Sequence, residues 1–531
     1  MNLRQSGSTH GFWSPLARWI DGHSAAMAGW FRFAAWPSVC ILSAFRFAFL
    51  TADFPNDSPW MIDQAKFTDE GWWGSAAVAH ALTGRWYVRG DYNPAVALPV
   101  WPTLLGAIFH FSGVSLVAAR ALNVSISLAT LVLVFFLVRR FTAKSSTTAL
   151  LAVLLLAASP FAFAFSRLAI LDSLVVFEFC LALFAASFAA RGRLWPLALV
   201  SLTITAMMLT KTTAAMLLAA IFVMTFSALG RKPSDFMRAA VAVVVVPGAL
   251  LKGYEGLVSA MGYAADYKYF FSVNAMPEID WPHALDTLGL FFQDCIWVDR
   301  VLYPAAFVVV VLALIWGQIL WRNALFTASW MVIAAQAVFI FSRQDDVAPR
   351  YFLVMLAPMA MIVVLAWDAV TVRWRSTGAR GPLAAAALLG LTMAASLIAN
   401  ATMIGHFLTH RDYDLRDAAA AIEKTVRSEP EQKALILGVS GNQISLMTGI
   451  PAINDGFGTE EMAAKVAGYQ PGWYLAWNDV ASEDQEFLSG FRIVKIASFP
   501  VFDDEDRNVL TLYKLVRRDV EQMRTAAPSA R

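Results

Sequence analysis

The chain has 531 residues, of which 58% are hydrophobic and 15% are charged. Soluble domains average roughly 45–50% apolar and about 25% charged residues, so this composition excludes an ordinary soluble protein and predicts a polytopic membrane protein. The 41 Lys and Arg residues against 39 Asp and Glu residues leave a net charge of +2, which argues against nucleic acid as a partner.

The segment 1–36 is expected to lie on the cytoplasmic side. Its Trp and Phe residues alternate with Arg18 and Arg32, which is typical of a helix in the membrane interface. The first apolar run starts only at the end of this segment, so no cleavable signal peptide is expected. A short first span at 37–50 then crosses the hydrocarbon layer, roughly 30 Å thick, and leads to an outer loop at 51–115.

The stretch 93–112 is apolar enough to span a membrane, but Pro94, Pro99 and Pro102 break any long helix there. We therefore expect a surface or re-entrant helix. The next span, 116–138, ends at a cluster of basic residues, which is a cytoplasmic stop signal.

The remaining apolar runs complete a membrane domain at 37–403 with about eleven spans and a second outer loop at 252–300. These runs cover 148–165, 174–190, 194–210, 214–229, 239–251, 301–320, 324–341, 352–370 and 383–403. With this threading the basic loops fall on one side, which is the positive-inside pattern and predicts a cytoplasmic N-terminus. The residues concerned are Arg139, Arg140, Lys144, Arg191, Arg193, Arg231, Lys232, Arg238, Arg322, Arg373, Arg375 and Arg380.

An odd number of spans places the segment 404–516 outside the cytoplasm. Short apolar runs alternate there with helix-like stretches, which predicts a small periplasmic α/β domain. The last residues, 517–531, are expected to form a flexible tail. The fold class is therefore an α-helical polytopic membrane protein with a small C-terminal α/β domain.

Two adjacent carboxylates, Asp69 and Glu70, precede Trp72 and Trp73 in the first outer loop. Indole rings favour the headgroup layer, so an acidic pair beside them is a place to meet a lipid-linked substrate. The alternative is that both acids complement the dipole of a helix that begins there, with Asp69 as its cap.

Further charged residues lie at the predicted outer ends of spans, where an ionisable group close to hydrocarbon is costly and is usually kept for a function. A folded bundle would bring them together in one outward cavity. For any single cation, the alternative is that it snorkels to the interface from a helix end. The charged residues are Arg120, Asp172, Lys211 and Arg350, and Tyr351 directly follows the last of them.

The order and spacing of these short motifs over 37–403 resemble the GT-C superfamily of integral-membrane glycosyltransferases. The resemblance is strongest to the branch that contains protein O-mannosyltransferases and the lipid A aminoarabinose transferase. Besides the acidic pair, it rests on Gly113-Val114-Ser115 before the Arg120 span, on the turn from Arg167 to Asp172, on Leu209-Thr210-Lys211 and on Arg350-Tyr351. It implies a sugar donor on polyprenyl phosphate and transfer outside the membrane with inversion.

The resemblance also implies a role for each residue. Asp69 would be the general base, with Glu70 orienting the acceptor or binding an ion, and Asp172 would be a second acid in the cavity. Lys211 and Arg350 would hold the donor phosphate, supported by Arg120 and Tyr351. A hydroxyl needs a base to become a good nucleophile, and fixed cations stabilise a departing phosphate. The stretch 93–99 lacks the basic residue that relatives often carry there.

Other candidates are weaker. Neither His80 nor His110 has a His or Cys partner at ligand spacing, so packed neutral imidazoles are expected. The three scattered cysteines, Cys40, Cys180 and Cys295, form no metal or redox motif and no structural disulfide is expected. No cofactor is predicted with certainty. Asp345-Asp346 has the oxygen ligands of a divalent-cation site, but a solvated loop is the favoured interpretation, and the metal requirement stays open.

The first hypothesis is thus a glycosyltransferase of a bacterial inner membrane, with a lipid, a glycan or a protein as acceptor. The alternative is a transporter or flippase for a lipid-linked saccharide, which would also place cations near the headgroup plane. A non-catalytic scaffold would explain the topology but not the converging charges.

Overall fold

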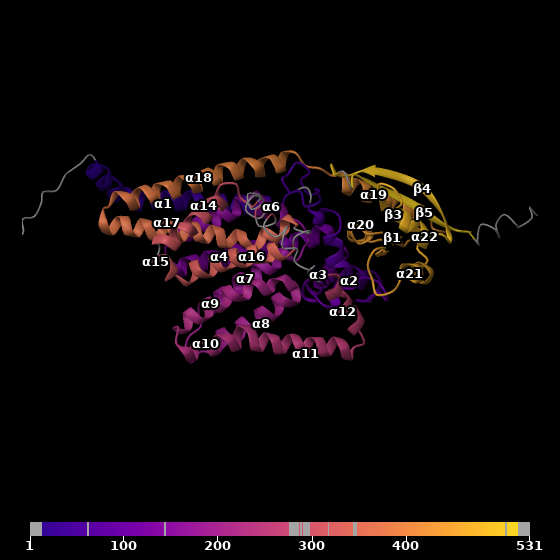
Figure 1. Ribbon diagram of the computed structural model, residues 1–531. Helices are drawn as coiled ribbons and strands as arrows, with labels where there is room; N and C mark the ends of the chain where they lie inside the picture. The colour runs from indigo at the N-terminus through magenta and orange to yellow at the C-terminus, as the bar shows by residue number, and fades with distance from the viewer. Residues whose placement is uncertain are drawn as a thin grey trace, which may run out of the picture.

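The computed structural model describes residues 13–60, 63–142, 145–274, 298–316, 318–343, 348–504 and 507–518, together with Asp286 and Gly289; for residues 13–28 it describes the backbone only. Long helices form one end of the molecule, and a five-stranded sheet with short helices forms the other (Figure 1). Asp345 and Asp346, the third cysteine Cys295 and much of the loop 252–300 lie outside the described residues.

Within the described parts of the chain, six helices are long and apolar enough to cross a membrane, and one bent pair would make a seventh. The six are α4 (Leu116–Phe141), η3 with α9 (Thr212–Leu217 and Leu218–Leu229), α10, η4 and α11 (Pro233–Ala240, Val241–Val245 and Val246–Ala260), α16 (Ala324–Arg343), η6 with α17 (Pro349–Phe352 and Leu353–Thr377) and α18 (Arg380–Thr409). Shorter helices are α3 (Val100–Ser112), α7 (Asp172–Ala186), α8 (Trp195–Thr210), α12 (Ala264–Val273), α14 (Leu302–Trp316) and α15 (Gln318–Trp321). The prediction of a multi-pass helical membrane protein is confirmed, while the number of about eleven spans stays a prediction.

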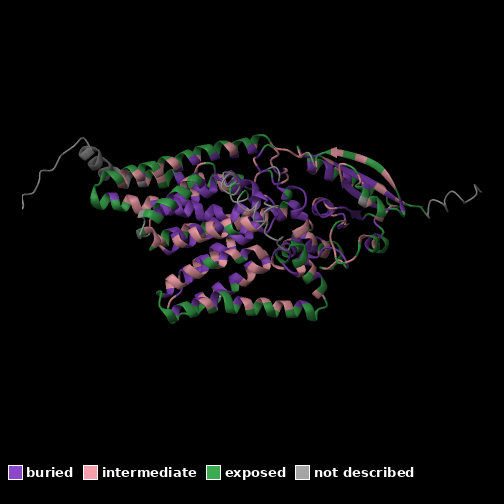
Figure 2. Ribbon diagram, in the orientation of Figure 1, coloured by how far each residue is buried: buried purple, intermediate pink, exposed green. Residues whose placement is uncertain are grey.

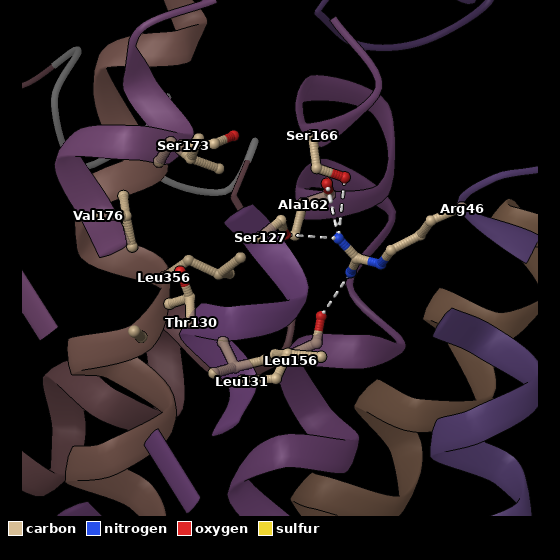
Figure 3. Close-up of a pocket in the computed structure, with 12 residues that line it drawn as sticks. Arg46, Ser127, Thr130, Leu131, Leu156, Ala162, Ser166, Ser173, Val176 and Leu356 are labelled. Atoms are coloured by element: carbon tan, nitrogen blue, oxygen red, sulfur yellow. Dashed lines mark hydrogen bonds between the residues drawn. The ribbon is translucent and has the colours of Figure 1, made fainter. Parts of the chain in front are cut away.

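The predicted span 148–165 is broken into α5 (Ser146–Ala157) and α6 (Pro160–Ser166), which meet at 62°. The break has a local cause, because Pro160 has no N–H to continue the helix and Ser159 caps α6 through the Ala162 N–H. Arg46 satisfies the carbonyls that the break exposes. Its Nη2 donates to Leu156 O at 3.0 Å, and its Nη1 donates to Ser166 Oγ at 2.9 Å (Figure 3).

The N-terminal helix also differs from the sequence prediction. Instead of an interfacial helix followed by a separate span, α1 (Trp13–Phe45) is one continuous helix. Pro37 lies inside it, and the expected boundary at residue 36 is not a helix end. Proline is tolerated within membrane helices because neighbouring groups satisfy the carbonyl that it frees.

The segment 51–115, predicted to be the first outer loop, contains η1 (Gln64–Lys66), α2 (Asp69–Thr83), η2 (Pro94–Val96) and α3. The prolines at 94 and 99 limit helix formation, since α3 begins only after Pro99. The core of the bundle lies around α17, of whose most apolar window 78% is buried. By contrast α11 and α18 present exposed faces along the outside (Figure 2), which is where lipid contacts a membrane protein.

The C-terminal sheet has the order β2-β1-β3-β5-β4. Strand β1 is parallel to β2 and β3, whereas β3–β5 and β5–β4 are antiparallel, so the predicted α/β domain is confirmed. The strands are β1 (Ile436–Leu437), β2 (Ala452–Ile453), β3 (Trp473–Trp477), β4 (Phe491–Pro500) and β5 (Val509–Arg517), and the helices are α19 (Asp414–Ser428), α20 (Gly441–Thr448), α21 (Met462–Tyr469) and α22 (Ser482–Phe487).

Candidate active site

Helix α2 begins with the two predicted acids, Asp69 and Glu70, and both side chains are buried. Carboxylates in a first helical turn complement the partial positive charge of the helix N-terminus. The N-cap position is Thr68, which makes no side-chain cap bond, and Asp69 is the first helical residue, so the alternative in which Asp69 caps this helix is wrong. Each acid instead meets a different arginine, which separates their surroundings.

Glu70 and Arg120 form a two-point ion pair that is almost completely buried. Arg120 Nε donates to Glu70 Oε1 at 2.8 Å, and Nη2 donates to Oε2 at 2.6 Å. Its Nη1 donates to the carbonyls of Leu50 and Ala52 at 2.8 and 2.7 Å. A guanidinium engaged in this way joins α4 to the loop after α1 and holds Glu70 in one position.

Glu70 also receives two hydrogen bonds from other parts of the chain. The Ala169 N–H donates to Oε1 at 2.7 Å, and Gln443 Nε2 donates to Oε2 at 3.0 Å. Ala169 belongs to the turn that leads to Asp172, and Gln443 belongs to α20 of the sheet domain. Glu70 therefore connects the helical bundle, the turn from Arg167 to Asp172 and the C-terminal domain.

Asp69 meets Arg350, whose Nη2 lies 3.0 Å from Asp69 Oδ2. This contact does not have the geometry of a hydrogen bond, so it is an ion pair only. The other oxygen of the carboxylate, Asp69 Oδ1, accepts a hydrogen bond from Thr68 Oγ1 at 3.2 Å. Arg350 is held from its other side by Asp63, to which Nη1 donates at 2.5 Å and the backbone N–H at 2.8 Å.

Asp172 and Lys211 form a third acid–cation pair, with Lys211 Nζ donating to Asp172 Oδ1 at 2.6 Å. The Tyr351 ring connects this pair to the Asp69–Arg350 pair, because Lys211 Nζ lies 4.7 Å and the Arg350 guanidinium 5.2 Å from its centroid. The structure thus brings Asp69, Asp172, Lys211, Arg350 and Tyr351 into one connected set.

Sequence reasoning missed two members of the site, Asp63 and Gln443. Asp63 is the N-cap of η1 and accepts from the Ala65 N–H at 2.8 Å while it holds Arg350. An Asp directly before a short helical turn is a common capping pattern, and nothing in its neighbourhood marks it as part of a charge network. Gln443 is neutral and lies in a separate domain, so it had no comparable signal.

The sheet domain docks directly on α2. The Gly71 N–H donates to Gln443 Oε1 at 2.9 Å, and Trp72 Nε1 donates to Val439 O at 2.9 Å. A Cβ at Gly71 would lie 2.2 Å from the Gln443 backbone nitrogen. Only glycine permits this close approach next to the two acids.

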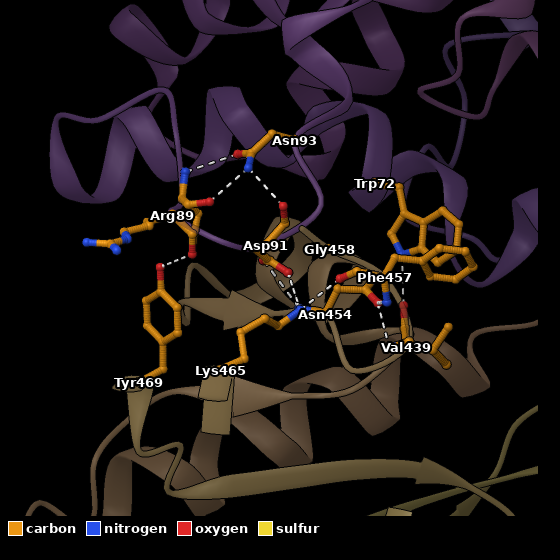
Figure 4. Close-up of polar contacts among 12 residues, drawn as sticks. Trp72, Arg89, Asp91, Asn93, Val439, Asn454, Phe457, Gly458, Lys465 and Tyr469 are labelled. Atoms are coloured by element: carbon orange, nitrogen blue, oxygen red, sulfur yellow. Dashed lines mark hydrogen bonds and ion pairs between the residues drawn. The ribbon is translucent and has the colours of Figure 1, made fainter. Parts of the chain in front are cut away.

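A second contact between the domains is polar and buried (Figure 4). Lys465 Nζ donates to Asp91 Oδ1 at 2.8 Å, and the Asn454 N–H donates to the same atom at 3.1 Å. Tyr469 Oη donates to the Arg89 carbonyl at 2.6 Å. The sheet domain is therefore fixed relative to the acidic helix at several points.

Asp53 is a third link between the loop after α1 and the sheet domain. Its Oδ2 accepts from the Leu415 N–H at 2.8 Å. Burial raises the pKa of Asp53 to about 7, against the opposing effects of this hydrogen bond and of the Arg120 charge.

In the described part of the chain, no group of three or more His, Cys, Asp or Glu side chains is arranged to hold a metal ion. His80 stacks on Trp86 with ring centroids 4.3 Å apart, as expected of a packed imidazole. His110 differs from the expectation, because it is exposed and its aromatic neighbour Phe111 is 87% exposed.

Residues 94–282 match the protein family described as dolichyl-phosphate-mannose-protein mannosyltransferase. A sequence search of curated proteins finds no match. Among solved structures, ArnT from Cupriavidus metallidurans bound to undecaprenyl phosphate matches with a TM-score of 0.57 and 12% identity, over 89% of this chain and 97% of that chain. Its apo state matches with the same score and identity over 92% and 98%.

The chain has a GT-C fold. The resemblance noted in the sequence is thereby confirmed at the level of the fold. The oligosaccharyltransferase of Archaeoglobus fulgidus in its apo form matches with a TM-score of 0.49 and 11% identity, over 89% of this chain and 74% of that chain. The family match covers Arg120, Asp172 and Lys211 and ends before Arg350.

Proposed function

We propose that this GT-C chain is a glycosyltransferase that moves a sugar from a polyprenyl-phosphate donor to an acceptor hydroxyl, with inversion. The observation that carries the proposal is the connected set in which the Asp69–Arg350 and Asp172–Lys211 pairs share the Tyr351 ring. It supplies a carboxylate to accept a proton and cations to stabilise a leaving phosphate, which are the two things this transfer needs.

Asp69 is the general base in this proposal. Its Oδ2 has an ion-pair contact to Arg350 but no hydrogen bond, so a lone pair is available for an acceptor hydroxyl. The hydroxyl oxygen forms the new bond to the anomeric carbon as its proton passes to Asp69. The bond to the phosphate oxygen breaks on the opposite face, so the configuration inverts.

Lys211 and Arg350 hold the donor phosphate. Both are charged donors next to one aromatic face, and Lys211 retains some exposure, with 14% of its side chain accessible. The phosphate that leaves gains negative charge, which preorganised cations stabilise without reorganisation. Asp172 keeps Lys211 in place until the phosphate arrives.

Glu70 and Arg120 act one step away from the reacting groups. Arg120 is buried, and its guanidinium already donates to Glu70 and to two backbone carbonyls. This engagement disfavours the phosphate contact that was predicted from the sequence. We propose that the pair positions Asp69 by anchoring the first turn of α2. Direct acceptor or ion binding by Glu70 is likewise disfavoured, because both of its oxygens already accept hydrogen bonds.

We further propose that the chain resides in a bacterial inner membrane with the acid–cation site and the sheet domain on the periplasmic side. The arginines at the far end of α4, Arg139 and Arg140, support this orientation through the positive-inside rule. The acceptor is a lipid, a glycan or a protein that reaches the site from the periplasm.

Mass spectrometry of envelope glycans, glycolipids and glycoproteins from cells with and without the chain tests the function. We expect one sugar to disappear from an envelope acceptor and its polyprenyl-phosphate form to accumulate. The purified chain in detergent should then transfer that sugar to the acceptor. Detergent micelles do not separate two aqueous compartments, so a transporter would have no measurable activity there. Failure of transfer in detergent, with movement of the lipid-linked sugar across a vesicle bilayer, would establish the transporter instead.

A further inference from the structure

A large cavity lies at the end of the bundle remote from the acid–cation site. It has a volume of 880 Å³ and opens among the ends of α4, α7 and α9 and the start of α16. Along α4, Arg120 and Arg139 are 19 positions apart, so the two ends are separated by roughly 28 Å at 1.5 Å per residue. This cavity, here called the basic cavity, has no part in the transfer chemistry.

Four arginines line the basic cavity, and none of the described residues that line it is acidic. They are Arg139, Arg140, Arg231 and Arg322. Like charges that converge on one space repel one another, and the repulsion is relieved when an anion lies among them. At the same end of the bundle, Arg191 donates two hydrogen bonds to Asp235, at 3.0 and 2.7 Å. The arginines of the basic cavity differ from Arg191, because no acidic residue is among the described residues that line the cavity with them.

One of the four side chains, that of Arg140, is held in place by the surrounding structure. Arg140 Nη2 donates to the Ser187 carbonyl at 2.8 Å, and its guanidinium lies 4.2 Å from the centroid of the Phe188 ring. Arg231 follows the C-cap Gly230 of α9, and its φ of 62° belongs to this helix end, where its N–H donates to the Phe226 carbonyl at 3.3 Å.

The walls of the basic cavity are apolar and continue to the lipid-facing surface. Phe136, Phe184 and Met224 line it beside the arginines, and Phe136 is 45% exposed on the outside of the bundle. A free phosphate ion would use only the arginines of this cavity. The apolar wall, which continues to the hydrocarbon, gives acyl chains a place to bind, so the cavity as a whole fits a molecule with an anionic headgroup and acyl chains.

We propose that the basic cavity binds the phosphate headgroup of an anionic phospholipid, with the first part of an acyl chain against the Phe136 wall. The positive-inside rule alone explains basic residues at this end of the bundle, but not their convergence on one space without acids among the described lining residues. The proposal is independent of the proposed transfer reaction.

The test compares two triple variants that remove the same charge from the same end of the bundle. The first is Arg139→Gln, Arg231→Gln and Arg322→Gln. The control is Arg193→Gln, Arg238→Gln and Arg373→Gln, three exposed residues that do not line the basic cavity. Native mass spectrometry and thermal shift measure the binding of phosphatidylglycerol, cardiolipin and phosphatidylcholine to the purified full chain, and soluble glycerol 3-phosphate is the competitor.

The wild type and the control variant should prefer the two anionic lipids over phosphatidylcholine by about tenfold or more, and the first variant should lose this preference. Equal losses in both variants, or no preference in the wild type, would overturn the proposal. Competition by glycerol 3-phosphate at the concentration of the lipid would show a free-anion site and overturn it as well. If the first variant does not fold, Arg139→Gln alone should weaken the preference about threefold or more, and an unchanged preference would decide against the proposal.

Discussion

Arg350 lies between two carboxylates, with Nη2 3.0 Å from Asp69 Oδ2 and Nη1 2.5 Å from Asp63 Oδ1. Asp63 makes the tighter contact, through the side chain and the backbone N–H of Arg350. The arginine is therefore anchored by Asp63. In the proposed mechanism, Arg350 turns toward the donor phosphate while Asp63 holds it, and Asp69 is released from its ion pair when the donor occupies the site.

Replacing Lys211 with Gln should weaken binding of a polyprenyl phosphate by about tenfold or more, because a charge-assisted bond to the phosphate is worth roughly 1.5–3 kcal/mol. Titration of the purified chain in nanodiscs measures the Kd. Lys252→Gln is the matched control, since Lys252 is exposed and pairs only with Glu255 among its described contacts. Equal affinity in the wild type and the Lys211 variant would exclude the phosphate role of Lys211.

Removing the Arg120 side chain should lower the free energy of unfolding of the chain, while the proposed phosphate-binding residues, Lys211 and Arg350, stay in place. Arg120→Ala leaves Glu70 buried without its charge partner, and breaking a buried pair in this way costs about 3–5 kcal/mol. The exposed pair Arg89–Glu460 provides the comparison, and Arg89→Ala should leave Tm unchanged. A Tm of the Arg120 variant equal to that of the wild type would show that the pair does not hold α2.

Gly71→Ala should loosen the sheet domain from α2. The new Cβ would lie 2.2 Å from a backbone atom of α20, so one of the two helices must move. Hydrogen exchange should rise in α20 and in the first turn of α2. Gly256→Ala in α11 is the control, because nothing lies within 4 Å of its added Cβ, and exchange there should stay as in the wild type.

The stability of the chain should fall between about pH 4 and pH 7 through Asp53. Its folded-state pKa, about 7, lies above the ordinary value, so the native state binds more protons in this window and loses stability as the pH rises. Asp53→Asn removes this contribution, and its Tm should therefore gain on the wild type as the pH is raised from 5 to about 8. Parallel Tm curves for the two proteins would show that Asp53 does not titrate in this range.

Much of the site could be predicted from the sequence because charged residues at the ends of apolar spans are conspicuous. Asp172, Lys211 and Arg350 each interrupt or flank a long apolar run, and burial near hydrocarbon is costly unless they are paired. Their mutual contacts depend on the bundle packing, which no local pattern encodes. The buried position of Arg120 shows the limit, since a helix-end arginine looks alike whether it faces a substrate or an internal acid.

The missed features have the same physical origin. Asp63 and Gln443 act only through residues that are distant in the chain, so local composition does not distinguish them. The break at Ser159-Pro160 did carry a signal, because a capping serine before a proline at the first helical position is a helix start. The continuous apolar stretch 148–165 was interpreted as one span because its hydropathy was given more weight than this helix-start signal.

The catalytic assignment of Asp69 is tested most directly by Asp69→Asn in the purified chain, once the sugar donor has been identified. We expect the rate of transfer to fall by about 10²-fold or more, since Asn cannot take the hydroxyl proton, while the Kd for the polyprenyl phosphate stays within about twofold. Transfer by the variant at the wild-type rate would contradict the account.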